Sequence, residues 1–377
     1  MKTIVNIISS ESPVPAYLFI REKYVTGDKL LFIAAKDAQP AMEQLIQFIK
    51  IPKEQIESIV FYREGDDFTY ERICRKMREV LKKEEHYYVN LAGGSRYMAL
   101  AIQQAFSKMN SDFFYVNVRD NTIVKSIFDD SIDDDDDYVY PIVKRLSIGE
   151  YLSLHGMQHD ADERNIHKPI RSEDYVTHIF DLFASRQLSN RDYEILETLR
   201  TNYRNSIRDD QWLSISRIEN GEVPHCYAIP DLSKFLKYIG FIPTQAGKLT
   251  KQELDFLTGG WFEEYCYYLA EREFQPEDIL IGVHIARPNI DHDNELDVIF
   301  IKENDLHVIE CKSGISNTKL FNEIIYKACA LKEALLGLKC HYHLYTLKKD
   351  DEQHNLRKFA AAMGISFSGY EALTSDR

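Results

Sequence analysis

Apolar runs alternate with helical patterns over the first 145 residues of the chain. The runs Ile4–Ile8, Lys29–Ala34 and Ile56–Tyr62 have the length and composition of buried strands. Between the last two, Gln39–Lys50 carries apolar residues at the spacing of one helix face. Strands that alternate with helices of this length form a largely parallel sheet with helices on both faces. The pattern therefore predicts a Rossmann-like α/β domain.

The alternation continues as far as an acidic run. The further helices and strands that it predicts are Tyr70–Lys83, Tyr87–Leu91, Arg96–Met109, Phe113–Val118 and Thr122–Phe128. The run Asp129–Asp137 follows them, and this density of like charge favours a solvated loop. A calcium loop is the alternative, but the run lacks the glycine and terminal glutamate of an EF-hand. We expect the first domain to cover residues 1–145.

The pattern becomes helical and polar between residues 146 and 249. Glu173–Ala184 and Arg191–Tyr203 are predicted as amphipathic helices, and Ser189 and Asn190 offer an N-cap for the second. We interpret this segment as a helical connector. A winged-helix module is the alternative that the same elements allow.

The last block, residues 250–377, predicts a mixed sheet flanked by helices. Asp293–Ile301 and Leu306–Lys312 have the pattern of two strands, and residues 302–305 between them form the predicted turn. A helix over 320–336, a strand over Cys340–Leu347, a helix over 353–363 and a short strand near Ile365–Ser368 follow.

The predicted hairpin carries candidate catalytic chemistry. Side chains alternate between the two faces of a strand, so Glu310 and Lys312 share one face, and Asp297 can lie beside them. Two carboxylates and a lysine suit a hard divalent cation, Mg²⁺ or Mn²⁺, next to a phosphodiester. The backbone carbonyl of Cys311 is a further candidate ligand. Glu263 lies upstream at the start of a predicted helix and is our choice for a third acid, with Glu264 as the alternative.

Composition limits the function classes. The chain has a formal net charge of −14, which argues against broad, salt-driven coating of nucleic acid but allows a local basic groove. Its 6 cysteines are scattered without a CxxC pair, which argues against a disulfide framework or a cysteine zinc site. No signal peptide or membrane-spanning run is visible. We expect a cytoplasmic protein without a membrane partner.

A glycine-rich turn joins a strand to a helix in the first domain. Two glycines let the backbone approach a ligand closely, and the N–H groups at the start of the helix suit phosphate oxygens. The polar loop after the first strand lies at the same edge of the predicted sheet, where ligands of parallel sheets bind. The candidate ligand-binding residues at this edge are Ser10, Glu11, Asn90, Gly93, Gly94, Ser95, Arg96 and Met98.

These motifs resemble those of a known family. Asp297 with Glu310-Cys311-Lys312 looks like the PD-(D/E)xK pattern of the restriction-endonuclease-like superfamily, in which a helical glutamate such as Glu263 often precedes the hairpin. The segment Asn90–Met98 looks like the signature of CARF domains, although alanine and serine stand at 92 and 95 where threonine is usual, and arginine stands at 96 where lysine is usual. The combination is similar to CRISPR ancillary nucleases with a single CARF domain.

The resemblance implies an allosteric enzyme. It implies a homodimer that binds cyclic tetra-adenylate, one of the cyclic oligoadenylates of type III CRISPR defence, through its CARF domains. Binding is then expected to activate metal-dependent cleavage of DNA or RNA in the C-terminal domain. The connector is expected to carry the motion between the two domains.

Two other interpretations come from the middle of the chain. A ligand-responsive transcriptional regulator is possible if the middle helices form a winged helix, although the arginines between Arg191 and Arg208 alternate with acids. A HEPN-type ribonuclease would need an arginine and a histidine spaced like Arg171 and His178. His155 and His159 have zinc-ligand spacing, but no third ligand is evident.

Overall fold

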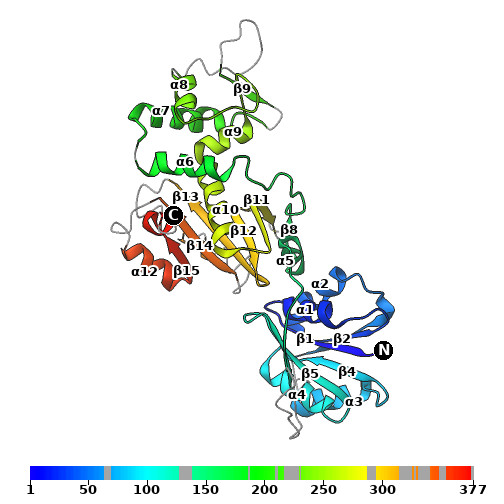
Figure 1. The fold of residues 1–377 in the computed structure, drawn as a ribbon. Coiled ribbons are helices and arrows are strands. Elements are labelled where there is room, and N and C mark those ends of the chain that lie inside the picture. Colours follow the sequence, from blue (N-terminus) through cyan, green and yellow to red (C-terminus); the bar gives the residue numbers. More distant parts are fainter. Residues whose placement is uncertain are drawn as a thin grey trace.

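The chain folds into two α/β domains and a largely helical module that includes a two-stranded sheet. They are arranged along one long axis (Figure 1). The structure is a computed structural model. It describes residues 1–62, 69–126, 138–185, 187–208, 211–215, 229, 231–286, 294–313, 325–326, 328–329, 340–347 and 354–374. The predicted acidic loop and most of the predicted helix 320–336 lie outside these residues.

The N-terminal sheet has seven strands in the order β3-β2-β1-β4-β5-β6-β7. The first five strands are parallel, whereas β6 and β7 are antiparallel to their neighbours. The strands are β1 (Thr3–Ile8), β2 (Lys29–Ala35), β3 (Ile56–Phe61), β4 (His86–Asn90), β5 (Asn110–Asn117), β6 (Thr122–Ser126) and β7 (Val139–Pro141).

Helices cover both faces of this sheet. One face packs α1 (Val14–Lys23) and α2 (Gln39–Phe48), and the other packs α3 (Tyr70–Val80) and α4 (Arg96–Phe106), each pair with its own buried apolar cluster. The Rossmann-like α/β prediction is confirmed. Short 3-10 turns, Lys36–Ala38 and Lys53–Gln55, precede α2 and β3. The predicted elements omit α1, whose first turn contains a proline that is tolerated there because that N–H has no helical partner.

The C-terminal sheet has six strands in the order β15-β14-β13-β12-β11-β8. β8 to β13 pair antiparallel, and β13 to β15 pair parallel. The mixed sheet is as predicted, but β11 is an addition, and β8 comes from the predicted connector. The strands are β8 (Gln158–His159), β11 (Asp278–Ala286), β12 (Asn294–Lys302), β13 (Asp305–Lys312), β14 (His341–Thr346) and β15 (Ile365–Ser368).

The hairpin of β12 and β13 has a two-residue turn, Glu303 and Asn304, with positive φ angles of 52° and 66°. Turns of this kind match the twist of the strands that they connect. On one face of the sheet, α10 (Trp261–Phe274) packs against β11, β12 and β13. The chain ends with α12 (His354–Ala362) and α13 (Tyr370–Thr374), which contact β15.

A middle module, residues 173–260, lies beyond the C-terminal sheet, at the opposite end of the molecule from the N-terminal domain (Figure 1). Its apolar residues share one buried cluster with α10. Its elements are α6 (Glu173–Ala184), α7 (Asn190–Thr198), a π-helical turn (Leu199–Arg204), β9 (Trp212–Ser214), α8 (Leu232–Tyr238), β10 (Lys248–Thr250), α9 (Lys251–Asp255) and a second π-helical turn (Phe256–Gly260).

Only the first part of the predicted connector lies between the two α/β domains. The helix α5 (Ile148–Leu154) contacts α2 of the N-terminal domain and β8 and β12 of the C-terminal sheet. One apolar cluster extends from Leu18 and Met42 through Leu152 to Ile299 and Val308. The helix α5 therefore links the packed cores of the two α/β domains, whereas the middle module lies beyond the C-terminal sheet.

Candidate active site and sensor site

Oxygen atoms of three hairpin residues surround the ammonium group of Lys312. The Lys312 Nζ lies 2.8 Å from Glu310 Oε1 and 3.2 Å from Asp297 Oδ2, and it donates a hydrogen bond of 3.1 Å to the carbonyl oxygen of Cys311. The Cys311 N–H also donates to Asp297 Oδ2 at 2.7 Å. The predicted set of Asp297, Glu310, Lys312 and the Cys311 carbonyl is therefore brought together at one point.

Burial makes this cluster electrostatically strong. The Glu310 side chain is only 6% exposed, and its Oε2 accepts a hydrogen bond of 3.1 Å from the Tyr342 hydroxyl. Burial and the neighbouring Glu310 raise the pKa of Asp297 to about 6. Burial lowers the pKa of Lys312, but the carboxylates of Asp297 and Glu310 outweigh that effect, and the net pKa lies above its ordinary value. Lys312 is therefore an ammonium at neutral pH.

The structure distinguishes the two helical glutamates. Glu263 lines a cavity of about 710 Å³ together with Glu295. Burial, followed by the charges of Asp297 and Glu295, raises its pKa to about 8. Glu264 points elsewhere, because its two carboxylate oxygens accept the backbone N–H groups of Ile170 and Arg171 at 2.9 and 3.1 Å. Glu264 thus holds the segment that leads into α6.

The donors at the hairpin fit a hard divalent cation. Two carboxylates and a backbone carbonyl are oxygen ligands, and all three already point at the Lys312 ammonium. Within the described part of the chain, no group of three or more His, Cys, Asp or Glu side chains is arranged to hold a metal. The oxygen set therefore suits an ion such as Mg²⁺ that keeps several of its own waters.

In the N-terminal domain, the glycine-rich turn packs directly on the end of β1. A Cβ atom at Gly93 would lie 1.7 Å from the Ile7 carbonyl oxygen, so no larger residue fits there. Gly94 has a φ of 66°, and a Cβ atom would lie 2.6 Å from the Ile7 side chain. The two glycines therefore bring the turn against the strand and set where α4 begins.

The other candidate binding residues divide into supporting and exposed groups. Asn90 is fully buried, donates to Asn6 Oδ1 at 3.0 Å and accepts from the Ala92 N–H at 3.1 Å. Ser95 caps α4 by accepting the Met98 N–H at 3.2 Å, and the Met98 side chain is fully buried. These side chains shape the turn. Of the candidate residues, Ser10, Glu11, Gly94 and Arg96 are exposed.

Three residues of the alternative pairs have structural partners of their own. Arg171 makes an ion pair of 3.2 Å with Glu253 and lies 4.3 Å from the ring centroid of Phe241, so it serves the packing of the middle module. His155 Nδ1 contacts the Tyr151 carbonyl oxygen at 2.8 Å. His159 Nε2 contacts Ser153 Oγ at 2.9 Å, so the two histidines do not share a ligand position.

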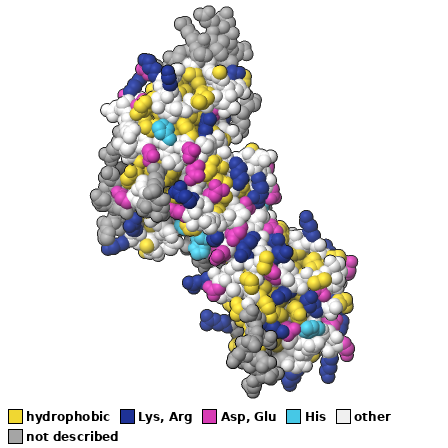
Figure 2. Space-filling view, viewed as in Figure 1, with side chains coloured by type: hydrophobic (Ala, Val, Ile, Leu, Met, Phe, Trp, Pro, Cys, Tyr) yellow, Lys and Arg dark blue, Asp and Glu magenta, His cyan; other side chains and the backbone are white. Residues whose placement is uncertain are grey.

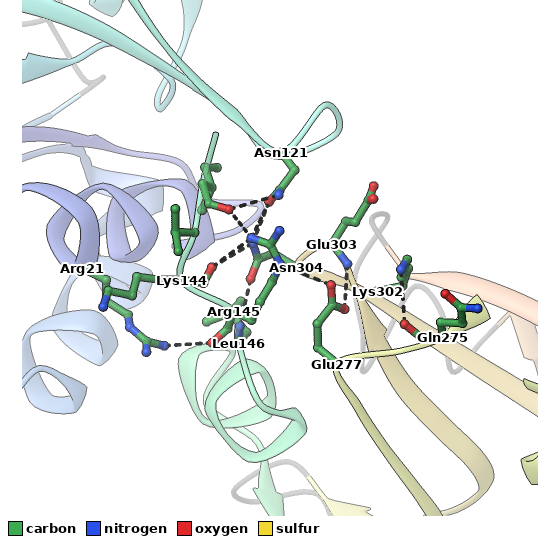
Figure 3. A network of polar contacts seen from close by, with 12 residues as sticks. Arg21, Asn121, Lys144, Arg145, Leu146, Gln275, Glu277, Lys302, Glu303 and Asn304 are labelled. Atoms are coloured by element: carbon green, nitrogen blue, oxygen red, sulfur yellow. Dashed lines mark hydrogen bonds and ion pairs between the residues drawn. The ribbon is translucent and has the colours of Figure 1, made fainter. Parts of the chain in front are cut away.

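A polar network joins the hairpin turn to the N-terminal domain (Figure 3). Asn304 donates to Asn121 Oδ1 at 2.9 Å and accepts the Leu146 N–H at 2.9 Å. Beside it, Glu277 accepts from Arg145 Nε at 3.2 Å and from the Glu303 N–H at 2.9 Å. The strands that carry Asp297 and Glu310 are thus attached to the N-terminal domain at their other end.

Known proteins share this architecture. Protein VC1899 from Vibrio cholerae is 18% identical with a TM-score of 0.71, and the match covers 99% of this chain and 95% of that one. Can2 from Sulfobacillus thermosulfidooxidans, solved with cyclic tetra-adenylate, is 19% identical with a TM-score of 0.66, and the match covers 98% and 95%. A type III CRISPR defence DNA nuclease activated by cyclic oligoadenylate is 13% identical with a TM-score of 0.51, covering 91% of this chain and 45% of that one. These likenesses show the fold.

No curated protein matches the chain. No helix in the described ranges has both the length and the apolar character to span a membrane.

Family models assign both domains. Residues 3–151 match the model of the Card1 CARF domain, and residues 250–371 match that of the Card1-like endonuclease domain. This chain therefore belongs to the CARF-domain nucleases, with a Card1 CARF domain joined to a Card1-like endonuclease domain.

Proposed function

We propose that the protein is a cyclic tetra-adenylate-activated, metal-dependent nuclease that cleaves phosphodiester bonds of DNA, RNA or both in type III CRISPR antiviral defence. The convergence of Asp297, Glu310 and the Cys311 carbonyl on Lys312 carries the proposal. The Card1-like endonuclease match supports the reaction class. The Card1 CARF match and the structural likeness to Can2, which was solved with cyclic tetra-adenylate, support the activator.

The residues of the site have distinct proposed roles. A divalent cation held by Asp297, Glu310 and the Cys311 carbonyl would supply Lewis-acid chemistry to the scissile phosphate. Lys312 stays protonated, so it stabilises negative charge that develops on the phosphate and orients the attacking water. Tyr342 fixes the rotamer of Glu310 from the neighbouring strand. Glu263 closes the cavity side of the site and is the candidate third acid.

The sensor site is proposed at the edge formed by the glycine-rich turn. Arg96 is exposed at the first position of α4, where the helix N-terminus already favours anions. A cyclic ring of repeated nucleotides presents equivalent faces to two identical turns, so a two-fold homodimer suits this ligand. An activator that binds one arrangement of the domains more tightly shifts the population toward that arrangement.

The proposal is tested by incubation of the protein with end-labelled single- and double-stranded DNA and RNA. Each polymer is tested with Mn²⁺, with Mn²⁺ plus each cyclic oligoadenylate, and with EDTA. We expect cleavage only with both Mn²⁺ and cyclic tetra-adenylate. Cleavage in EDTA, or full activity of Glu310→Gln, would overturn the metal-dependent assignment.

A charge reversal tests the sensor site separately. Arg96→Glu should lose binding of labelled cyclic tetra-adenylate, whereas Lys108→Glu, an exposed change just beyond the other end of α4, should retain it. Unchanged affinity of Arg96→Glu would show that the phosphate role of Arg96 is wrong.

A further inference from the structure

Two cavities meet at Arg200, beside the hairpin site. The first is the cavity of about 710 Å³ that contains Glu263, and its wall from the middle module includes Arg200 and Arg204. The second measures about 300 Å³ and shares Arg200. Its other lining residues include Phe183, Tyr193, Leu257, Trp261 and Ser313. Ser313 directly follows Lys312, so this second cavity opens next to the candidate catalytic lysine.

The second cavity offers aromatic faces. Phe183 is half-buried and stacks on Trp261, which is only 3% exposed, with ring centroids 4.4 Å apart and an interplanar angle of 22°, so Phe183 and Tyr193 supply the accessible aromatic surface. Tyr193 meets Phe183 edge to face at 6.4 Å and is 42% exposed. Aromatic surfaces of this kind bind nucleobases by stacking, irrespective of sequence, because every base has a π face. Glu197 at the wall adds an acceptor for the amino groups of bases.

The first cavity offers fixed cations. Lys251 Nζ and Arg204 Nε both contact Asp255 Oδ1, at 2.9 and 3.0 Å, and Lys251 also donates to the Arg204 carbonyl oxygen. Two π-helical turns, Leu199–Arg204 and Phe256–Gly260, contact each other and shape this wall. The protein is acidic overall, and on the face seen in Figure 2 basic and acidic side chains are interspersed. Three cations, Arg200, Arg204 and Lys251, therefore line the same cavity as Glu263, together with the carboxylates of Asp255 and Glu295.

Arg200 and Arg204 belong to the segment that would supply the recognition helix of a transcriptional regulator. The structure places Arg200 and Arg204 in the wall of the cavity that holds Glu263, which faces them toward the nuclease site. Arg200 is exposed and Arg204 is half-buried, so the arginine side of this cavity is open to solvent. Their placement in one cavity with Glu263 favours contact with a nucleic acid that enters the candidate active site.

We propose that the cavity lined by Phe183, Tyr193 and Trp261 is a nucleobase pocket, which holds one unstacked base of the substrate next to the scissile phosphate. Arg200, at the junction of the two cavities, binds the backbone phosphate between that base and the site. The middle module is thereby a substrate-positioning element of the nuclease. This inference rests on the proposed function and adds a subsite to it.

An abasic scan tests the pocket. Labelled oligonucleotides of the polymer that the wild type cleaves carry one abasic residue at successive positions around a mapped cleavage site. With cyclic tetra-adenylate and Mn²⁺, we expect one position next to the cut at which loss of the base slows wild-type cleavage roughly 5- to 150-fold, the range of one base-stacking contact. In Tyr193→Ala this position should lose its effect, and in Tyr193→Phe the effect should return.

Matched variants separate the pocket from general damage. Tyr238→Ala removes a comparably exposed tyrosine from the same module, and Arg191→Ala removes an exposed arginine that is paired with Glu194. Both should behave as wild type, whereas Arg200→Ala should raise the KM for every substrate and Arg200→Lys should recover part of the loss. An equal response of Tyr193→Ala and wild type to every abasic position overturns the pocket while leaving the nuclease assignment intact. Absence of any cleavage by the wild type overturns both.

Discussion

Asn304 donates a hydrogen bond from its side-chain amide to the side-chain oxygen of Asn121, 2.9 Å away (Figure 3). Each residue lies in the turn of a hairpin and has a positive φ angle, 66° for Asn304 and 50° for Asn121. One hairpin belongs to the CARF sheet and the other carries Asp297 and Glu310. The turn of a CARF-domain hairpin therefore contacts the turn of the hairpin that carries the candidate catalytic residues. This contact is a short physical route by which activator binding can reach the nuclease.

Removal of the Asn304 side chain should weaken this coupling. We choose Asn304→Gly because glycine keeps the left-handed backbone while every side-chain hydrogen bond of Asn304 is lost. Each lost bond contributes about 1 kcal/mol, so we expect stimulation by cyclic tetra-adenylate to fall roughly fivefold or more. The measurement is the ratio of cleavage rates with and without activator, alongside activator affinity. Asn110→Gly, at the start of β5, is the control. Equal stimulation of Asn304→Gly and wild type would show that the signal takes another route.

Tyr342 should matter for catalysis through Glu310. Its hydroxyl donates to Glu310 Oε2 at 3.1 Å within a buried site, and Tyr342→Phe removes only that hydroxyl. A hydrogen bond to a charged group contributes about 1.5–3 kcal/mol, so we expect kcat to fall about tenfold or more with little change in KM. Single-turnover cleavage with saturating Mn²⁺ measures this. A Tyr342→Phe enzyme with wild-type kcat would mean that Glu310 is positioned by its other contacts alone.

Glu263 should make the stability of the metal-free protein depend on pH. Its pKa in the fold is about 8, above the ordinary carboxyl value of 4.5, so the fold favours the protonated acid. That contribution is fully present below the unfolded-state pKa and is lost as the pH rises through about 8. Glu263→Gln is neutral throughout, so its Tm in EDTA should exceed that of the wild type at pH 9 and match it at pH 4. Glu271→Gln, an exposed change on the same helix, is the control. A difference in Tm between Glu263→Gln and the wild type that does not change with pH would contradict a raised pKa of Glu263.

The elements set by local pattern were predictable from the sequence. The hairpin consists of two short apolar runs separated by a polar stretch that contains Asn304, so Asn294–Lys302 and Asp305–Lys312 could be placed nearly to the residue. The helix Val14–Lys23 could not, because Pro13 and Pro15 give the same signal as a loop. The strand Asp278–Ala286 was not predicted because Gly282, with a φ of 64°, interrupts its apolar run.

The candidate site depends on contacts between distant segments, and these were less predictable. The sequence pattern predicted that Asp297, Glu310 and Lys312 lie together because one hairpin carries all three. Tyr342 comes from a strand that joins β13 only through parallel pairing, for which the sequence offers no register. The choice between Glu263 and Glu264 rests on which side of α10 faces the sheet edge. The position of Arg200 follows from how the middle module docks, which no local pattern encodes.

Metal binding should compete with the Lys312 ammonium. Three oxygen atoms, from Asp297, Glu310 and Cys311, lie within 3.2 Å of Lys312 Nζ, so an ion that uses these oxygens must displace the ammonium or share them with it. We expect Lys312→Met to bind Mn²⁺ about tenfold more tightly than the wild type and to cleave nothing, because the charge that stabilises the phosphate is gone. Isothermal titration with Mn²⁺ measures the affinity, with Lys302→Met at the far end of the hairpin as the control and Asp297→Asn as the variant expected to bind weakly. Weaker Mn²⁺ binding by Lys312→Met than by the wild type would contradict this competition and would mean that Lys312 supports the ion instead.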